Sequence, residues 1–174
     1  YRGRRAITGF DPAELWAHCV AVGTAARELG RRVPNVVPEE AMVAGLLHDI
    51  GMILALQAWT PEFTQVVAQA TLVNSTSFAQ LERTHVGATH EELGGALCDQ
   101  WHFPLALVHA CQFHHDFRVL PADAQAMPAL VHLADRMAAR LGAGFCRSVD
   151  GEGLEAEACQ VLGLSRDDLQ AVEA

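Results

Sequence analysis

The feature that most constrains the fold is a pair of polar residues, His48 and Asp49, inside an otherwise apolar run, Ala44-Gly45-Leu46-Leu47-His48-Asp49-Ile50-Gly51. The leucine and isoleucine side chains of this run favour burial, whereas an ionised carboxylate is costly to bury unless a positive group meets it. That group can be an arginine, a set of hydrogen-bond donors, or a metal ion that His48 helps to hold. The run therefore predicts a polar centre within a hydrophobic core.

Length and composition indicate one folded domain. The chain has 174 residues, of which 51% are hydrophobic and 19% charged, so it can bury a sizeable core and is not disordered. Alanine, leucine and valine dominate, and strand-like alternation is scarce. We therefore expect residues 1–174 to form a single all-α domain, a helical bundle.

The charge and cysteine content limit the partners and the location. The net charge is −9, every basic residue is an arginine, and no basic stripe is evident, which argues against a nucleic-acid partner. We expect no apolar run long enough to span a membrane, and no signal peptide is recognisable, so no membrane partner is expected. The five cysteines lack paired spacing, as in a reducing compartment. These features predict a cytoplasmic protein of bacterial type.

Capping signals divide the chain into helices. Asp11-Pro12-Ala13-Glu14 and Thr89-His90-Glu91-Glu92 each combine an N-cap residue with an acidic residue three positions later. The patterns predict a turn at 74–77, a loop at 142–153, and a short helix that ends near Arg83. The other helices are expected at about 11–32, 39–49, 52–59, 60–72, 89–101, 104–115, 127–141, 154–162 and 165–172.

Histidines and carboxylates at several of these helices form a candidate metal site. Imidazole and carboxylate together suit Fe, Mn or Zn, and the lack of cysteine pairs argues against a structural zinc knuckle. Helical bundles usually build metal centres from ligands on several helices. The candidate ligands are His18, His48, Asp49, His90, His114, His115 and Asp135.

Each of the two aspartates could instead form a salt bridge with Arg83, Arg136 or Arg140. His114 and His115 are adjacent, and neighbouring helical side chains diverge by about 100°, so only a local distortion would let both ligate. The i,i+4 pairs Cys98/His102 and Cys111/His115 are a weaker alternative for a soft metal. His132 is expected to support the site by packing, and His85, His102 and His109 to lie at the surface or in the core.

The order of these candidate residues along the chain resembles that of the HD superfamily of metal-dependent phosphohydrolases. The resemblance extends over about residues 10–141, and five places in the sequence match in order: His18, His48-Asp49, Thr89–Gly94, His114-His115 and His132–Asp135. Within the superfamily, the stretches Gly45–Gly51, Trp101–Pro104 and Leu130–Arg136 are most similar to the HDOD signalling domains.

The resemblance implies an HD-domain-like helical bundle with one to three divalent transition-metal ions. Fe or Mn would be the expected metal, with Zn, Ni or Mg as alternatives. Asp49 would be the catalytic, metal-bridging residue of an active member, and His18, His48, His90, His114, His115 and Asp135 the terminal ligands. Catalytic relatives hydrolyse phosphoesters, whereas the relatives most like this chain are usually regulatory modules of bacterial signalling.

Three departures from the family pattern bear on activity. Met52 stands where catalytic relatives often carry a lysine, and the chain has no lysine at all. The segment after His115 lacks the Gly-Tyr-Pro signature of cyclic-di-GMP phosphodiesterases. HDOD modules also carry a further helical half before the His18 helix, of which we expect almost nothing here. An apolar face left uncovered by that half would favour a homo-oligomer.

Three hypotheses follow, and whether the protein is an enzyme stays open among them. The leading one is an HDOD-type regulatory domain with a retained metal site, whose partners are signalling protein domains or a small phosphorylated ligand. The second is an active phosphohydrolase acting on a nucleotide or cyclic nucleotide. The third is a metal-free helical scaffold held by ion pairs.

Overall fold

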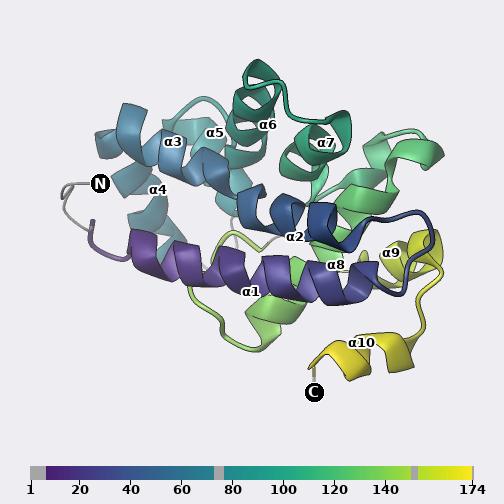
Figure 1. Cartoon of the computed structure of the whole chain (residues 1–174). Coiled ribbons are helices and arrows are strands. Elements are labelled where there is room, and N and C mark those ends of the chain that lie inside the picture. The colour runs from purple at the N-terminus through teal and green to yellow at the C-terminus, as the bar shows by residue number, and fades with distance from the viewer. Residues whose placement is uncertain (1–6, 73–76, 150–152, 174) are drawn as a thin grey trace.

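The computed structural model describes residues 7–72, 77–149 and 153–173, and the regular structure in these ranges is helical (Figure 1). The all-α prediction is therefore confirmed. The elements are α1 (Pro12–Gly30), α2 (Pro38–Leu47), α3 (Ile50–Ala58), α4 (Thr60–Leu72), α5 (Phe78–His85), α6 (His90–Gln100), α7 (Leu105–Phe113), the 3₁₀ turns η1 (Phe117–Val119) and η2 (Ala122–Ala124), α8 (Ala126–Arg140), α9 (Glu155–Leu162) and α10 (Arg166–Glu173).

Two helices begin at the expected capping signals. The Asp11 side chain accepts a hydrogen bond from the Ala13 backbone N–H (2.8 Å), so α1 begins at Pro12. At α6, Thr89 and Glu92 form both bonds of the expected capping box. The two 3₁₀ turns were not predicted, and most of the expected turn at 74–77 lies outside the described residues.

Two hydrophobic clusters meet at the middle of the molecule. One joins α1, α2, α7, α8 and α9, and the other joins α3, α4, α5 and the start of α1. Along α1, the change from one cluster to the other falls between Cys19 and Val22, next to His18. Between α2 and α3 it falls at the His48–Asp49 break. The polar centre therefore lies where the two clusters join.

Helices α2 and α3 correct one expectation. The stretch Pro38–Ala58 has the length and composition of a membrane span, although no such run was expected from the sequence. Half of its most apolar window is buried within the fold, and core helices commonly have this composition. The polar pair His48–Asp49 interrupts the stretch near its midpoint, which places the two helices around the centre.

Candidate metal centre

The structure brings all seven candidate ligands together. They come from the middle of α1 (His18), the α2–α3 break (His48 and Asp49), the first turn of α6 (His90), the end of α7 (His114 and His115) and α8 (Asp135). His115 has an exposed fraction of 7%, and the other six have at most 1%. Whether each of them binds a metal stays a prediction, but their convergence is plain.

Asp49 lies at the middle of this group and separates it into two sides. Its Oδ2 atom is 3.3 Å from His48 Nε2 and 3.9 Å from His18 Nε2. Its Oδ1 atom is 3.4 Å from His90 Nε2 and 3.7 Å from His114 Nε2. The two carboxylate oxygens therefore face different pairs of imidazoles.

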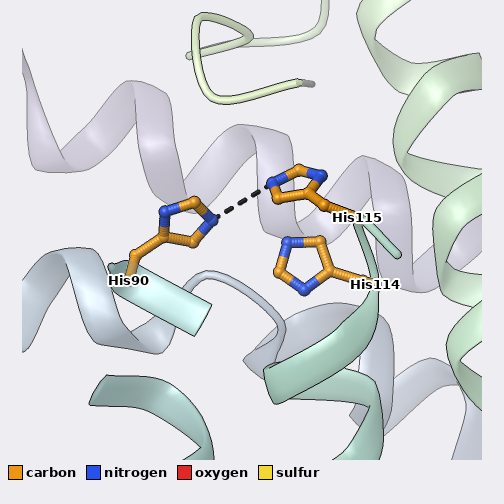
Figure 2. A group of neighbouring side chains, drawn as sticks. All are labelled: His90, His114 and His115. Atoms are coloured by element: carbon orange, nitrogen blue, oxygen red, sulfur yellow. Dashed lines mark hydrogen bonds between the residues drawn. The ribbon is translucent and has the colours of Figure 1, made fainter. Parts of the chain in front are cut away.

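Each side is completed by one further residue. Asp135 Oδ1 is 3.0 Å from His18 Nε2 and 4.0 Å from His48 Nε2. On the opposite side, His115 Nε2 is 3.2 Å from His90 Nε2, with the His114 ring beside them (Figure 2). We call His18, His48 and Asp135 the α1 side, and His90, His114 and His115 the α6 side. Within each set, the candidate ligand atoms lie within 4.8 Å of one another, a spacing that could hold a metal ion.

Both adjacent histidines can face the centre because α7 ends before them. The helix ends at Phe113, and His114 is its C-cap residue, so the 100° divergence of helical neighbours does not apply to His115. The end of α7 is thus the local distortion that both histidines need in order to face the centre.

The histidine rings are fixed from behind by hydrogen bonds at Nδ1. His18 Nδ1 bonds to the Ala143 carbonyl (3.2 Å), and His48 Nδ1 bonds to the Gly45 carbonyl (2.7 Å). His114 Nδ1 lies 3.1 Å from the carbonyls of both Ala110 and Cys111. Because a carbonyl can only accept, Nδ1 carries the proton in each ring, and the Nε2 lone pair faces the centre. This is the arrangement that metal-binding histidines adopt.

Several buried atoms at the centre lack a hydrogen bond of good geometry. They are His18 Nε2, His48 Nε2, His114 Nε2, Asp49 Oδ1 and Asp135 Oδ1. Buried polar atoms without partners are costly, and their clustering indicates a shared ligand. Inward-facing nitrogen lone pairs together with two carboxylates fit a divalent transition metal.

The acid–base properties of the ligands agree with this fit. Burial and the neighbouring imidazoles hold the pKa of His114 and of His115 well below the usual value, so both rings are neutral and able to ligate. Burial alone would raise the pKa of Asp49, but His48 and the other imidazoles hold it well below its usual range. The centre therefore keeps Asp49 ionised.

His18 and His90 behave differently in the absence of a cation. Burial lowers the pKa of His18, yet Asp135 and other neighbours raise it to about 10. Burial likewise lowers the pKa of His90, and the Glu82 carboxylate reverses the effect and raises it to about 10. Without a bound cation, the rings of His18 and His90 are therefore protonated, and their positive charge balances the neighbouring carboxylates.

Glu82 is a residue of the centre that was not predicted from the sequence. It lies on α5 with an exposed fraction of 1%. Its Oε2 atom accepts hydrogen bonds from the His90 backbone N–H (3.0 Å) and from His90 Nδ1 (2.7 Å). A signal was available, because Glu82 shares the helical spacing of the buried Phe78 and Leu81. An acidic residue on the buried face of a helix requires a partner.

The loop Ala143–Ser148 closes the α1 side of the centre. Besides the bond from His18 to Ala143, the Ser148 hydroxyl donates to Asp49 Oδ2 (3.4 Å), and the Phe145 N–H donates to the Glu14 carbonyl (3.2 Å). The sequence predicted a loop here without any contact to the site. Its residues lie beyond the region that carries the family resemblance.

Salt bridges from the three arginines considered do not account for the two aspartates, so that alternative is wrong. Arg83 pairs with Glu92 (2.9 Å), while Arg136 and Arg140 pair with Glu155 (3.2 and 2.8 Å). These contacts lie away from the centre, so they leave Asp49 and Asp135 to the histidines.

The remaining histidines and cysteines lie outside the candidate ligand groups. No cysteine belongs to the groups found among the described residues, and Cys98 Sγ instead lies 3.5 Å from Cys111 Sγ. His132 Nδ1 bonds to the His114 carbonyl (2.8 Å), as expected for a supporting residue. His102 is exposed, and His85 and His109 are half-buried.

A family model of the HDOD domain matches residues 2–117 of the chain. An HDOD domain protein of unknown function from Geobacter sulfurreducens has a similar solved structure, with 28% identity, a TM-score of 0.74, and coverage of 95% of this chain and 59% of that chain. The MmoQ response regulator from Methylococcus capsulatus str. Bath has 25% identity, a TM-score of 0.70, and coverage of 95% and 62%. An uncharacterized protein of Treponema pallidum (strain Nichols) is 22% identical over 129 residues, which are 74% of this chain and 25% of that protein. The chain thus spans less than two thirds of each of these relatives.

Proposed function

Because the chain belongs to the HDOD domain family, we propose that it is a regulatory signalling domain with an HD-type metal centre in its helical core. The observation that carries the proposal is the convergence of His and Asp side chains, with unpartnered Nε2 and carboxylate atoms, on one buried point. Its partners would be signalling domains attached to it or a small phosphorylated ligand, in a bacterial cytoplasm. The similarity to a response regulator supports this role.

The residues at the centre would divide the work of holding one to three ions, with Fe or Mn expected first. Asp49 would contribute to both sides, since its two oxygens face different imidazoles. The α1 side would add a carboxylate, Asp135, and the α6 side a third imidazole, His115. A bound divalent cation supplies positive charge that balances the two carboxylates and attracts phosphoryl oxygens.

Regulation is favoured over turnover by the surroundings of the centre. Met52 has an exposed fraction of 0% within the second hydrophobic cluster, so this position offers no cation to a phosphoryl group. A cleft of about 740 Å³ between α1 and α2–α3 has Asp49 among its lining residues, and the others are apolar side chains such as Trp16, Val43 and Ile53. This lining offers no basic side chain that would stabilise the charge developing on a phosphoryl group during transfer.

One observation favours the second candidate, a metal-dependent phosphohydrolase. The placement of Asp49 between two sets of ligands matches the layout of two-metal sites that act on phosphate esters. The two functions share the metal centre and differ in turnover, so they call for separate tests.

Metal analysis of protein purified without added ions tests the shared premise. We expect a substantial fraction of one or more ions per chain, and only trace metal would remove both candidates in favour of the metal-free scaffold. Assays on generic phosphodiesters and nucleotides with Mn²⁺ or Fe²⁺ then separate the two. We expect little or no turnover, and robust hydrolysis that is lost in His48→Ala would establish the enzyme instead.

A further inference from the structure

The two sides of the centre differ in the charge that they supply. The α1 side has its own carboxylate, Asp135, in addition to the shared Asp49. The α6 side has three imidazoles, and the shared Asp49 is its only carboxylate within 4.0 Å of the inward-facing Nε2 atoms among the described residues. Glu91 interacts with the His115 backbone, but no contact of its carboxylate with an inward-facing Nε2 atom is found among the described residues. The carboxylates in contact with these nitrogens are therefore distributed unequally between the two sides.

Glu82 lies where it can correct this inequality. It does not face the centre, because the His90 ring lies between them and bonds to Glu82 through Nδ1 and to the α6 side through Nε2. The Nδ1 atoms of His18, His48 and His114 instead face neutral backbone carbonyls. His90 is thus the one of these four rings that is backed by a carboxylate.

We propose that Glu82 is a positioning residue that supplies to the α6 side, through His90, the negative charge that Asp135 supplies directly to the α1 side. A carboxylate behind a ligating imidazole fixes its tautomer and raises its basicity, and the loss of such a partner typically weakens metal binding about 10- to 100-fold. The inference rests on the proposed metal centre. It adds a residue to that centre and predicts which side depends on it.

Glu82 also has a purely structural contact, which the test must separate from the charge. Its Oε2 atom accepts the backbone N–H of His90, one of the unpaired donors at the start of α6. Glu82→Gln keeps an acceptor oxygen of the same reach and removes the charge, whereas Glu82→Ala removes both. The difference between the two variants separates orientation from charge.

The matched control is Glu92→Gln, which removes a carboxylate near the same helix start. Glu92 forms the capping box with Thr89 and pairs with the exposed Arg83, but it makes no contact with the candidate ligands. Asp135→Asn is the mirror variant for the α1 side. The four variants and the parent chain are titrated with Mn²⁺ and with Zn²⁺ by calorimetry, which gives the affinity and the number of sites.

We expect Glu82→Gln to weaken one class of sites about 10-fold and Glu82→Ala up to about 100-fold, with the other class nearly unchanged. Asp135→Asn should weaken the other class, and Glu92→Gln neither. In metal-free protein, the ¹⁵N and ¹H signals of the His90 ring should move in Glu82→Gln and not in Glu92→Gln. A purely structural role would leave the metal affinities of Glu82→Gln like those of the parent.

Two failures are distinguishable. A parent chain that binds neither metal would remove the proposed function, although the ring signals of His90 would still test its bond to Glu82. A parent chain that binds metal, with Glu82→Gln no weaker than Glu92→Gln or with both site classes weakened equally, would overturn the role of Glu82 and leave the metal centre intact.

Discussion

The Nε2 atom of His18 lies 3.0 Å from the Oδ1 atom of Asp135, which joins the first long helix of the fold to α8 inside the core. Both side chains are almost completely buried. Neither can reach water, so the pair is favourable only with a positive charge between or on its members. The stability of the protein should therefore depend on which cation occupies this position.

Removal of metal should destabilise the folded chain. An ion that binds only the folded state at 100 times its dissociation constant contributes about 2.7 kcal/mol. For a chain of this size, that corresponds to a difference in Tm of roughly 5–10 °C. Thermal unfolding followed by circular dichroism, before and after chelation and after readdition of Mn²⁺ or Zn²⁺, measures the effect. Asp49→Asn serves as the control, and its Tm should respond clearly less to metal; an equal response in both proteins would place the ion elsewhere.

Replacement of Met52 by lysine should destabilise the chain and create no catalyst. The side chain is fully buried among apolar neighbours, so an ammonium group there would lack a partner. We expect Met52→Lys to cost about 3–5 kcal/mol and the volume-conserving Met52→Leu less than about 1.5 kcal/mol. Urea unfolding gives both values. Hydrolase activity gained by the lysine variant would show that this position can reach the centre.

Gly51→Ala should disturb the contact that positions His90. A Cβ atom on Gly51 would overlap the backbone carbonyl of His90, whereas one on Gly94, across the same α3–α6 contact, would meet its neighbours at 3.4 Å or more. We therefore expect Gly51→Ala to cost about 2–3 kcal/mol and Gly94→Ala to be neutral or stabilising by up to about 1 kcal/mol. Urea unfolding of the two variants measures the difference. Equal free energies of unfolding would show that α3 and α6 can move apart without cost.

Gly144→Ala should displace the loop that holds His18. Both Gly144 and Gly142 have positive φ (69° and 66°), so alanine costs each about 1–2 kcal/mol from backbone strain. Only at Gly144 would the added Cβ overlap the Glu14 carbonyl and lie 2.7 Å from the backbone nitrogen of His18, while Gly142 has open space. Metal titration should thus show weaker binding in Gly144→Ala and parent-like binding in Gly142→Ala. Unchanged binding in both variants would separate the loop from the centre.

The sequence predicted the helices well because their signals are local. The Asp11 and Thr89 caps and the apolar spacing determine where helices begin, whatever the rest of the chain does. A bend after the second helix was also expected, but at Gly51, whereas the structure has the break at His48–Asp49, between Leu47 and Ile50. The length of the apolar stretch formed by α2 and α3 was underestimated, because the polar pair divides it in the sequence.

The residues that converge at the centre were predictable from the sequence, and the residues that support them were less so. The seven candidates came from their order along the chain and from the family resemblance. Ser148 was not predicted because its partner Asp49 is distant in sequence and a single hydroxyl side chain carries no local signal. Glu82 had a signal, its place on the buried face of α5, that was not used. The use of both His114 and His115 depended on where α7 ends, which tertiary packing decides.

The backbone carbonyls behind His18, His48 and His114 have one more consequence. Each ring is held by its own anchor rather than by the other rings, so the loss of one side chain leaves the rest in register. Damage to the centre should therefore be graded, with each substitution subtracting from affinity by its own amount instead of collapsing the whole arrangement. With such independent anchors, the remaining candidate ligands would keep their geometry after any one of them is replaced.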